Sequence, residues 1–241
     1  MRNSRLFLAT AIALALFSPA AFAGKSIEKV MGSITAHAGE DYGSLETVNG
    51  SIRVESGAKA GNVATVNGSV HLESGAAIGD AETVNGSIKA DGKLKADSLE
   101  TVNGSIRLGD HSSVGRIETV NGSVFAGRGS QVARNVETVN GSIGLVDTDV
   151  NGGIATVNGD ITVGVGSHVR GGITVEKPNS GWMPVSMKQR KLRIVIGPDA
   201  VVEGPLVFKR DVTLYVHKTA RIGKVTGATA VSYDGARPPQ D

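Results

Sequence analysis

One phrase of five residues, Thr-Val-Asn-Gly-Ser, recurs along the chain at nearly constant spacing. Its threonine falls at seven positions, which are Thr47, Thr65, Thr83, Thr101, Thr119, Thr138 and Thr156. The steps are 18 residues, except for one of 19 residues between Thr119 and Thr138, and the last copy ends in Asp160 instead of Ser. A short unit repeated at fixed spacing is typical of solenoids, in which each unit buries its apolar face against its neighbours.

The apolar residues of each repeat follow a strand pattern. The second residue after each phrase glycine is Ile or Val and the fourth is small or aliphatic, as in Ile52 and Val54, with a polar residue between them. This alternation places both apolar residues on one face of a strand, and no helical period of 3.6 persists. Each repeat holds about three short strand-like runs separated by Gly, Asn, Asp and Ser. We therefore predict an all-β fold, a single-stranded parallel β-helix with about 18 residues per coil and about 4.8 Å between equivalent residues.

The Asn-Gly pair is predicted to form a corner of each coil. Gly adopts positive φ without steric cost and Asn tolerates it, so corner geometry is one interpretation of the pair. The other interpretation is a ladder in which the stacked side-chain amides bond from coil to coil. Its members are Asn49, Asn67, Asn85, Asn103, Asn121, Asn140 and Asn158. We expect the valine before each Asn to point into the core. Hairpins are rejected because the apolar pattern repeats at 18 residues and is not reflected about the turn.

A column of glutamates should lie on the outer surface. Glu46, Glu82, Glu100, Glu118 and Glu137 occupy one repeat position. Because stacked like charges repel, we expect this column to be solvated. The glycine-rich calcium-binding nonapeptide pattern is absent. The sequence therefore predicts no metal and no cofactor.

The first 23 residues have the pattern of a secretory signal peptide. Arg2 and Arg5 precede an apolar run from Leu6 to Phe17, and Ala21-Phe22-Ala23 forms a cleavage motif. The apolar run is too short to cross a bilayer comfortably. We expect cleavage after Ala23, no transmembrane segment in the mature chain, and a bacterial periplasmic, secreted or cell-surface location. With no Cys in the chain, stability must come from packing and backbone pairing.

Charge is distributed unevenly along the mature chain. Residues 24–160 carry a net charge of −6 and residues 161–241 a net charge of +6, so the overall charge is near zero. A neutral chain gives no electrostatic reason to expect a nucleic-acid partner.

Four regions are predicted after the signal peptide. Regular coils should occupy residues 24–175, a loop excursion 176–191, irregular C-terminal coils and a cap 192–233, and a disordered tail 234–241. The excursion holds the only Trp of the chain and a basic cluster. Because loops on rigid scaffolds often carry function, it is the candidate contact site; packing of Trp182 on the solenoid flank is an equal alternative. Its candidate residues are Trp182, Met183, Met187, Lys188, Arg190 and Lys191.

The repeated Gly-Ser-Ile/Val phrases, together with Ala-Arg-Ile-Gly-Lys-Val at residues 220–225, resemble two bacterial families. These are the polymer-forming bactofilins and the exported adhesin-type β-solenoid proteins. The resemblance covers most of residues 30–225 and implies a right-handed parallel β-helix with a structural or assembly role. Bactofilins as a rule lack a cleaved signal peptide, so the leader favours the exported relatives. An 18-residue turn would also suit the left-handed helix of hexapeptide-repeat proteins.

Three functions are compatible with these features. The favoured one is a non-enzymatic structural or adhesin-like protein that presents a repetitive surface for self-association or cell-envelope contacts. An enzyme acting on polysaccharide or acyl substrates is a second hypothesis. It is not favoured, because the five His residues are scattered and no nucleophile motif accompanies them. A ligand-binding module using residues 176–191 is the third. No catalytic residue is predicted.

Overall fold

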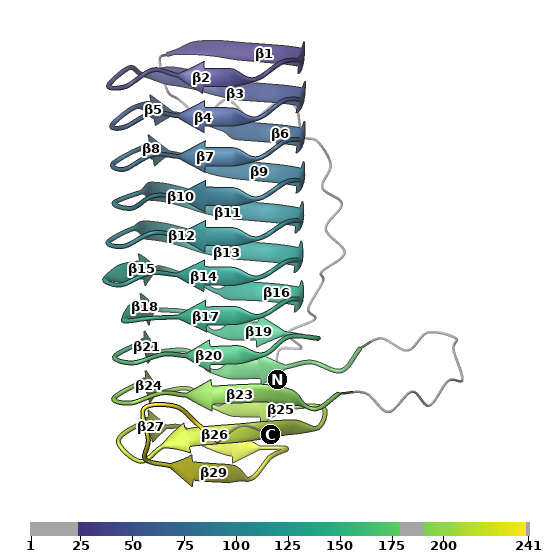
Figure 1. Cartoon of the computed structure of the whole chain (residues 1–241), viewed down its shortest axis with the longest axis vertical. Helices are drawn as coiled ribbons and strands as arrows, with labels where there is room; N and C mark the ends of the chain where they lie inside the picture. The colour runs from purple at the N-terminus through teal and green to yellow at the C-terminus, as the bar shows by residue number, and fades with distance from the viewer. Residues whose placement is uncertain (1–23, 179–189, 240–241) are drawn as a thin grey trace, which may run out of the picture.

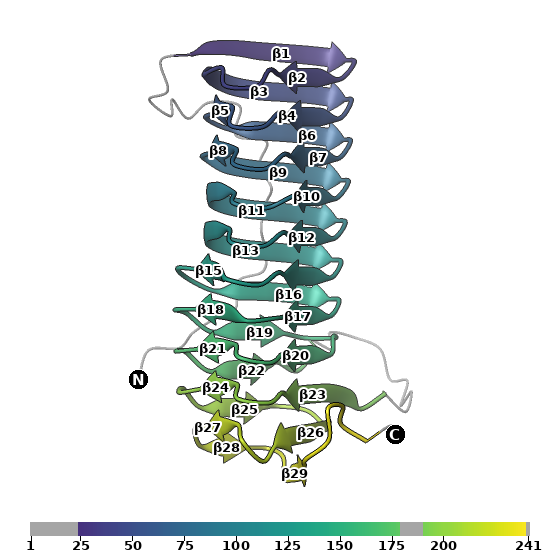
Figure 2. The same cartoon turned by 60° about the vertical axis from the view of Figure 1, so that its left-hand side comes forward.

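The described part of the chain is one long β-solenoid. The structure is a computed structural model that describes residues 24–178 and 190–239. These residues contain 29 strands and no helix, and neighbouring strands pair in parallel from coil to coil. The coils stack into a rod with β1 at one end and β29 at the other (Figures 1 and 2). The predicted all-β parallel β-helix is therefore confirmed.

One side of the rod is an 11-stranded sheet with one strand per coil, which gives eleven coils. Its strands are β2 (Ile34–Ala36), β4 (Ile52–Val54), β7 (Val70–Leu72), β10 (Ile88–Ala90), β12 (Ile106–Leu108), β14 (Val124–Ala126), β17 (Ile143–Leu145), β20 (Ile161–Val163), β23 (Leu192–Ile196), β26 (Val212–His217) and β29 (Ala230–Tyr233). Ile34 pairs with Ile52, and Ile52 pairs with Val70. The spacing of the phrase is therefore the length of one coil.

An 18-stranded sheet forms the rest of the wall. Its longer run contains β1 (Lys25–Met31), β3 (Tyr42–Asn49), β6 (Val63–Asn67), β9 (Asp80–Asn85), β11 (Lys95–Asn103), β13 (Ser113–Asn121), β16 (Val136–Asn140), β19 (Ile154–Thr156), β22 (Ile173–Val175), β25 (Leu206–Phe208) and β28 (Val225–Thr226). The short strands beside it are β5 (Lys59–Ala60), β8 (Ala77–Ile78), β15 (Ser130–Val132), β18 (Thr148–Val150), β21 (His168–Val169), β24 (Val201–Val202) and β27 (Arg221–Ile222).

The interior is filled by columns of apolar side chains. The Ile or Val that follows each phrase glycine by two residues is buried in every coil, and so is the residue two further on. The first column consists of Ile34, Ile52, Val70, Ile88, Ile106, Val124, Ile143 and Ile161. Stacking equivalent positions removes each coil's apolar face from water. This burial is the main force that holds coil to coil.

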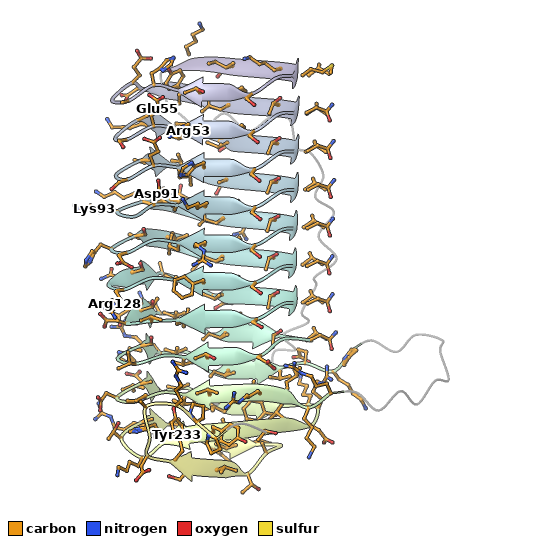
Figure 3. The ribbon with its side chains drawn as sticks, viewed as in Figure 1. Arg53, Glu55, Asp91, Lys93, Arg128 and Tyr233 are labelled. Carbon is orange, nitrogen blue, oxygen red and sulfur yellow. The ribbon has the colours of Figure 1, made fainter. Side chains whose placement is uncertain are left out.

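The coil register survives the predicted excursion. β22 ends at Val175 and β23 begins at Leu192, yet Ile161 pairs with Ile194, 33 residues later. The intervening residues therefore leave the wall and return to it in phase. At the C-terminal end, Tyr233 Oη donates a hydrogen bond of 3.3 Å to the Ile196 carbonyl (Figure 3). Arg193 donates to the Pro239 carbonyl at 2.5 Å.

The left-handed corner of each coil lies away from the Asn-Gly pair. Positive φ recurs in the turn that follows the strands of the 11-stranded sheet, at Gly39, Gly57, Gly75, Lys93, His111, Gly129, Asp147, Gly166 and Asp199. No phrase Asn has positive φ, and Gly141, at φ 159°, is in extended backbone. The interpretation of Asn-Gly as a positive-φ corner is therefore wrong.

Close stacking of the corners explains the phrase glycine. A Cβ built on Gly68 would lie 2.0 Å from the carbonyl oxygen of Gly50, and one on Gly86 would lie 1.9 Å from that of Gly68. Backbone from one coil occupies the space that a side chain would need. Glycine is required there by contact between coils and not by its own torsion angles.

Two alanine substitutions separate these two uses of glycine. Gly57→Ala places a side chain at φ 70° with no atom within 4 Å, so its cost should be about 1–2 kcal/mol, that of a left-handed residue. Gly68→Ala must displace the backbone of the coil before it. It should therefore cost at least twice as much in urea unfolding. Equal losses for the two variants would contradict this explanation of the phrase glycine.

Candidate functional site

The seven phrase asparagines form a continuous amide ladder along one edge of the rod. Each Nδ2 donates to the Oδ1 of the Asn one coil earlier, beginning with Asn67 to Asn49 at 2.9 Å and ending with Asn158 to Asn140 at 3.0 Å. The side chains are exposed. All six bonds point the same way, so the amide dipoles add along the rod. Donors are directed toward the N-terminal end and acceptors toward the C-terminal end.

A guanidinium closes the acceptor end of this ladder. Arg210 Nη1 contacts Asn158 Oδ1 and donates to the Val157 carbonyl at 2.9 Å. A positive charge at the end to which the acceptors point is the favourable arrangement of charge and dipole, as at the C-terminus of a helix. No sequence signal predicted this contact, because 52 residues separate Arg210 from Asn158.

The other residues of the phrase also act between coils. Thr65 is buried and its Oγ1 donates to the Gly50 carbonyl at 2.8 Å, a bond that recurs in the neighbouring coils. Ser51 Oγ accepts the backbone N–H of Ser69 at 3.2 Å. Where the last copy has Asp160, its Oδ1 accepts the N–H of Arg193 at 2.8 Å. The carboxylate therefore takes the place of the serine oxygen where the excursion rejoins the wall.

The valine of the phrase points outward, contrary to the prediction. Val48 is 36% exposed and the later valines are half-buried, whereas Thr47 is 4% exposed. Strand alternation counted from the buried Leu45 would have placed Thr47 inside and Val48 outside. Hydrophobicity alone was misleading, because the hydroxyl of the buried threonine is satisfied by a carbonyl of the preceding coil.

A half-buried surface results, which we call the Glu–Val face. It is the outer side of β3, β6, β9, β11, β13 and β16. It consists of the glutamate column Glu46, Glu82, Glu100, Glu118 and Glu137 beside the valine column Val48, Val66, Val84, Val102, Val120 and Val139. Toward the N-terminal end it is hollowed into a groove of about 390 Å³, lined by residues that include Val48, Val66, Glu46 and Glu82.

Carboxylates in this groove are poorly neutralised. Burial, reinforced by Glu28, raises the pKa of Glu46, and its Oε2 is buried without a hydrogen-bond partner among the described residues. Burial, followed by the charges of Glu100 and Asp80, raises the pKa of Glu82. Farther along the face, Arg116 contacts Glu100 and lies 3.5 Å from Glu118. Unpaired negative charge is therefore concentrated at the N-terminal part of the face.

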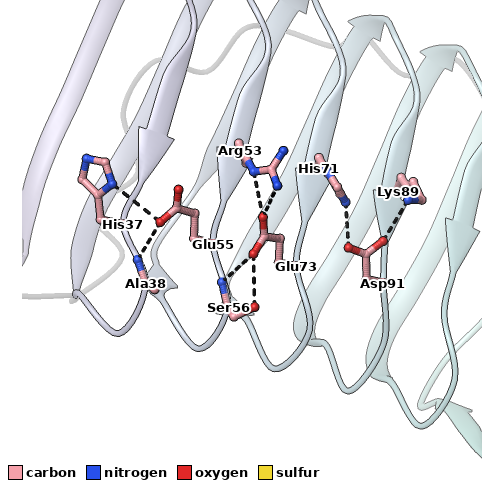
Figure 4. A network of polar contacts seen from close by, with 9 residues as sticks. All are labelled: His37, Ala38, Arg53, Glu55, Ser56, His71, Glu73, Lys89 and Asp91. Carbon is pink, nitrogen blue, oxygen red and sulfur yellow. Dashed lines mark hydrogen bonds and ion pairs between the residues drawn. The ribbon is translucent and has the colours of Figure 1, made fainter.

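A different side of the rod carries ion pairs that join successive coils (Figure 4). Arg53 Nε donates to Glu73 Oε1 at 2.7 Å, and Ser56 donates to Glu73 Oε2 through both its N–H and its hydroxyl, each at 3.1 Å. These bonds, led by that from Arg53, lower the pKa of Glu73. The exposed charges are thus used to bind one coil to the next.

The same arrangement recurs one coil later. Asp91 accepts from Lys89 Nζ at 2.9 Å and lies 2.9 Å from His71 Nε2. Lys89 first, and then His71, lowers the pKa of Asp91. Figure 3 shows Arg53, Glu55, Asp91, Lys93 and Arg128 on this side of the rod. The next column member, Arg107, lies over the Phe125 ring at 5.1 Å.

The predicted contact loop falls largely outside the described residues. Trp182, Met183, Met187 and Lys188 lie there, whereas Arg190 and Lys191 are described. Arg190 forms an ion pair with Asp160, and Lys191 is exposed. Arg190 therefore stands beside the last Asn-Gly corner, with Asp160 and Arg210 lining the same shallow depression.

Other site types were sought in the described ranges. Across residues 24–178 and 190–239, no group of three or more His, Cys, Asp or Glu side chains is placed to hold a metal ion. No helix long and apolar enough to cross a membrane occurs in these ranges. Comparisons of the chain with protein-family models, curated proteins and solved structures found no match.

The amide ladder predicts a difference between inner and terminal asparagines. Asn103→Ala removes two amide bonds and should cost about 1–2 kcal/mol, since a net hydrogen bond contributes about 1 kcal/mol. Asn49→Ala removes one bond and should cost about half as much. Urea unfolding of both variants provides the measurement. Equal losses would show that the amides do not act as a continuous ladder.

The raised and lowered carboxyl pKa values predict opposite responses to pH. The folded-state pKa of Glu82 is raised, so its charge destabilises the fold at neutral pH and this penalty disappears as pH falls. Glu82→Gln should raise the melting temperature at pH 7 and have little effect near pH 4. Glu73, whose pKa is lowered, should behave oppositely: Glu73→Gln lowers the melting temperature at pH 7, and the loss fades in acid. Melting curves between pH 4 and 8 that show the same sign for both variants would refute this assignment.

Proposed function

We propose that this protein is an exported, non-enzymatic, structural or adhesin-like β-solenoid whose Glu–Val face makes contacts with other copies and with the cell envelope. The proposal combines the secretory pattern of residues 1–23 with a rod whose walls are repetitive. The observation that carries it is the Glu–Val face. It combines a stripe of valines, one of them 36% exposed, with adjacent carboxylates that lack cationic partners in its N-terminal part.

Charge favours a staggered contact between copies. The glutamate columns of two Glu–Val faces would repel if they met in register. The C-terminal coils instead carry cationic side chains with little shielding, among them Arg221 and Lys224, and residues 161–241 have a net charge of +6. An acidic, partly apolar face on one copy is therefore complementary to the basic end of another. Such heterologous contacts propagate and do not close on themselves.

The polar side chains that an enzyme would employ are engaged between coils. His71 pairs with Asp91, and His168 Nε2 lies 2.7 Å from Glu203. His217 Nδ1 lies 2.9 Å from Thr219 Oγ1. These contacts support a scaffold over the enzymatic alternative. Binding through residues 176–191 stays a separate hypothesis.

Sedimentation velocity of residues 24–241 at low and high salt tests self-association. We expect concentration-dependent association at low ionic strength that is lost at high ionic strength, because salt screens the complementary charges. A monomer at high protein concentration, whatever the salt, would overturn the proposal.

A matched pair of variants locates the contact. Glu82→Gln should weaken association, although it is expected to stabilise the fold, so unfolding cannot explain the loss. Asp97→Asn removes the same charge from an exposed carboxylate that makes no hydrogen bond or ion pair within the described chain, and it should leave association unchanged. Equal effects of the two changes would assign the contact to net charge and not to the Glu–Val face.

A further inference from the structure

The last Asn-Gly corner differs from the six before it in the bonding of its glycine amide. In the earlier corners, the glycine N–H donates to the carbonyl oxygen of the Asn one coil later. The donors are Gly50, Gly68, Gly86, Gly104, Gly122 and Gly141, at 2.9–3.2 Å. Gly159 N–H donates to no acceptor in the described chain. The reason is topological: the chain leaves the wall before the next coil could supply a corner carbonyl at this position.

The asparagine of this corner is also in a different environment. In the inner corners, Oδ1 accepts from the neutral amide of the next asparagine. At Asn158 it is contacted by the Arg210 guanidinium instead. A positive charge on the carbonyl oxygen withdraws electrons from Cγ and makes that carbon a better electrophile.

A buried hydroxyl without a partner lies beside the same corner. Thr156 is fully buried, and its Oγ1 makes no hydrogen bond, unlike Thr138 Oγ1, which donates to the Gly122 carbonyl. A Cβ built on Gly159 would lie 3.2 Å from Thr156 Oγ1. The amide that carries an unbonded proton therefore has an oxygen free to accept it nearby.

We propose that Asn158-Gly159 is a self-modifying site at which the asparagine converts to aspartate or isoaspartate, while the other phrase asparagines are protected by the stack. Gly159 N attacks Asn158 Cγ, and a new C–N bond closes a five-membered succinimide. The Cγ–Nδ2 bond breaks, and Nδ2 leaves as ammonia with the proton lost from Gly159 N–H. One water molecule then opens the ring at either carbonyl, and no other reactant is needed.

The conversion changes the end of the amide ladder. A carboxylate at position 158 cannot donate to Asn140 Oδ1, so the bond of 3.0 Å is lost. It gains an ion pair with Arg210, and the isoaspartate product adds one backbone atom to the corner. The modification thus places a negative charge between the regular coils and the basic C-terminal coils.

Asn151-Gly152 provides a natural control outside the phrase. Arg170 contacts Asn151 Oδ1, as Arg210 contacts Asn158, but Gly152 N–H is bonded to the Arg134 carbonyl at 3.1 Å. It therefore has the activating cation without the free nucleophile. If the free N–H is required, Asn151 should remain unmodified while Asn158 reacts.

Peptide mapping by mass spectrometry of residues 24–241, incubated at pH 7.4 and 37 °C and sampled over weeks, tests the proposal. We expect Asn158 to convert at least several-fold faster than each of the six other phrase asparagines and Asn151. The same chain in urea should lose this selectivity, because every Asn-Gly pair is then equally free. Conversion of Asn158 no faster than that of the others in the folded chain would overturn the proposal, as would equal conversion of Asn151.

Arg210→Gln isolates the contribution of the guanidinium. It should slow conversion at Asn158 several-fold while leaving the rates at Asn49 to Asn121 unchanged, since those corners lie in other coils. Unchanged or faster conversion at Asn158, with the inner corners still protected, would contradict activation by Arg210. Gly159→Ala, which hinders the attacking nitrogen, should also slow the reaction, and an unaltered rate would contradict attack by that nitrogen.

Discussion

The structure depends on the contact between successive Asn-Gly corners. At each corner the backbone of one coil approaches the backbone of the next so closely that only a hydrogen atom fits on the glycine. The amide, hydroxyl and N–H groups around that contact then bond from coil to coil. Because all of these bonds require the same alignment, a slip of one residue would break them together and would also turn the apolar columns outward. The phrase therefore determines the register of the stack.

This register gives each wall of the rod a separate character. Stacking a repeat makes a column of every outward position, so one wall carries ion pairs between coils, one edge carries the amide ladder, and one wall carries the Glu–Val face. The ion pairs lower the pKa of their carboxyl groups, whereas half-burial beside like charges raises the pKa of those on the Glu–Val face. Carboxylates held at a cost to stability are a recognised mark of surfaces that act on something else. This contrast is the reason for assigning contacts to the Glu–Val face.

The regular pattern ends where the chain leaves the wall between β22 and β23. The coil returns in phase, but the last phrase is left without the following corner that its predecessors have. Asp160 and Arg210 satisfy part of this deficit by side-chain contacts, while Thr156 and Gly159 remain unpaired. The point at which the repeat fails is therefore chemically distinct from the six identical corners before it, although its sequence is nearly the same.

The sequence by itself determined the fold class, the coil length and the buried columns, because an exact spacing of 18 residues with apolar alternation is compatible with few other architectures. It also placed the asparagines in one column. Only the tertiary structure decided what each member of the phrase does. The valine lies outside and the threonine inside, because a carbonyl of the preceding coil satisfies the buried hydroxyl. The glycine is needed because of the neighbouring coil and not because of its own φ. Arg210 meets Asn158 through a long excursion that periodicity cannot describe, since contacts between distant segments depend on how the coil returns to the wall.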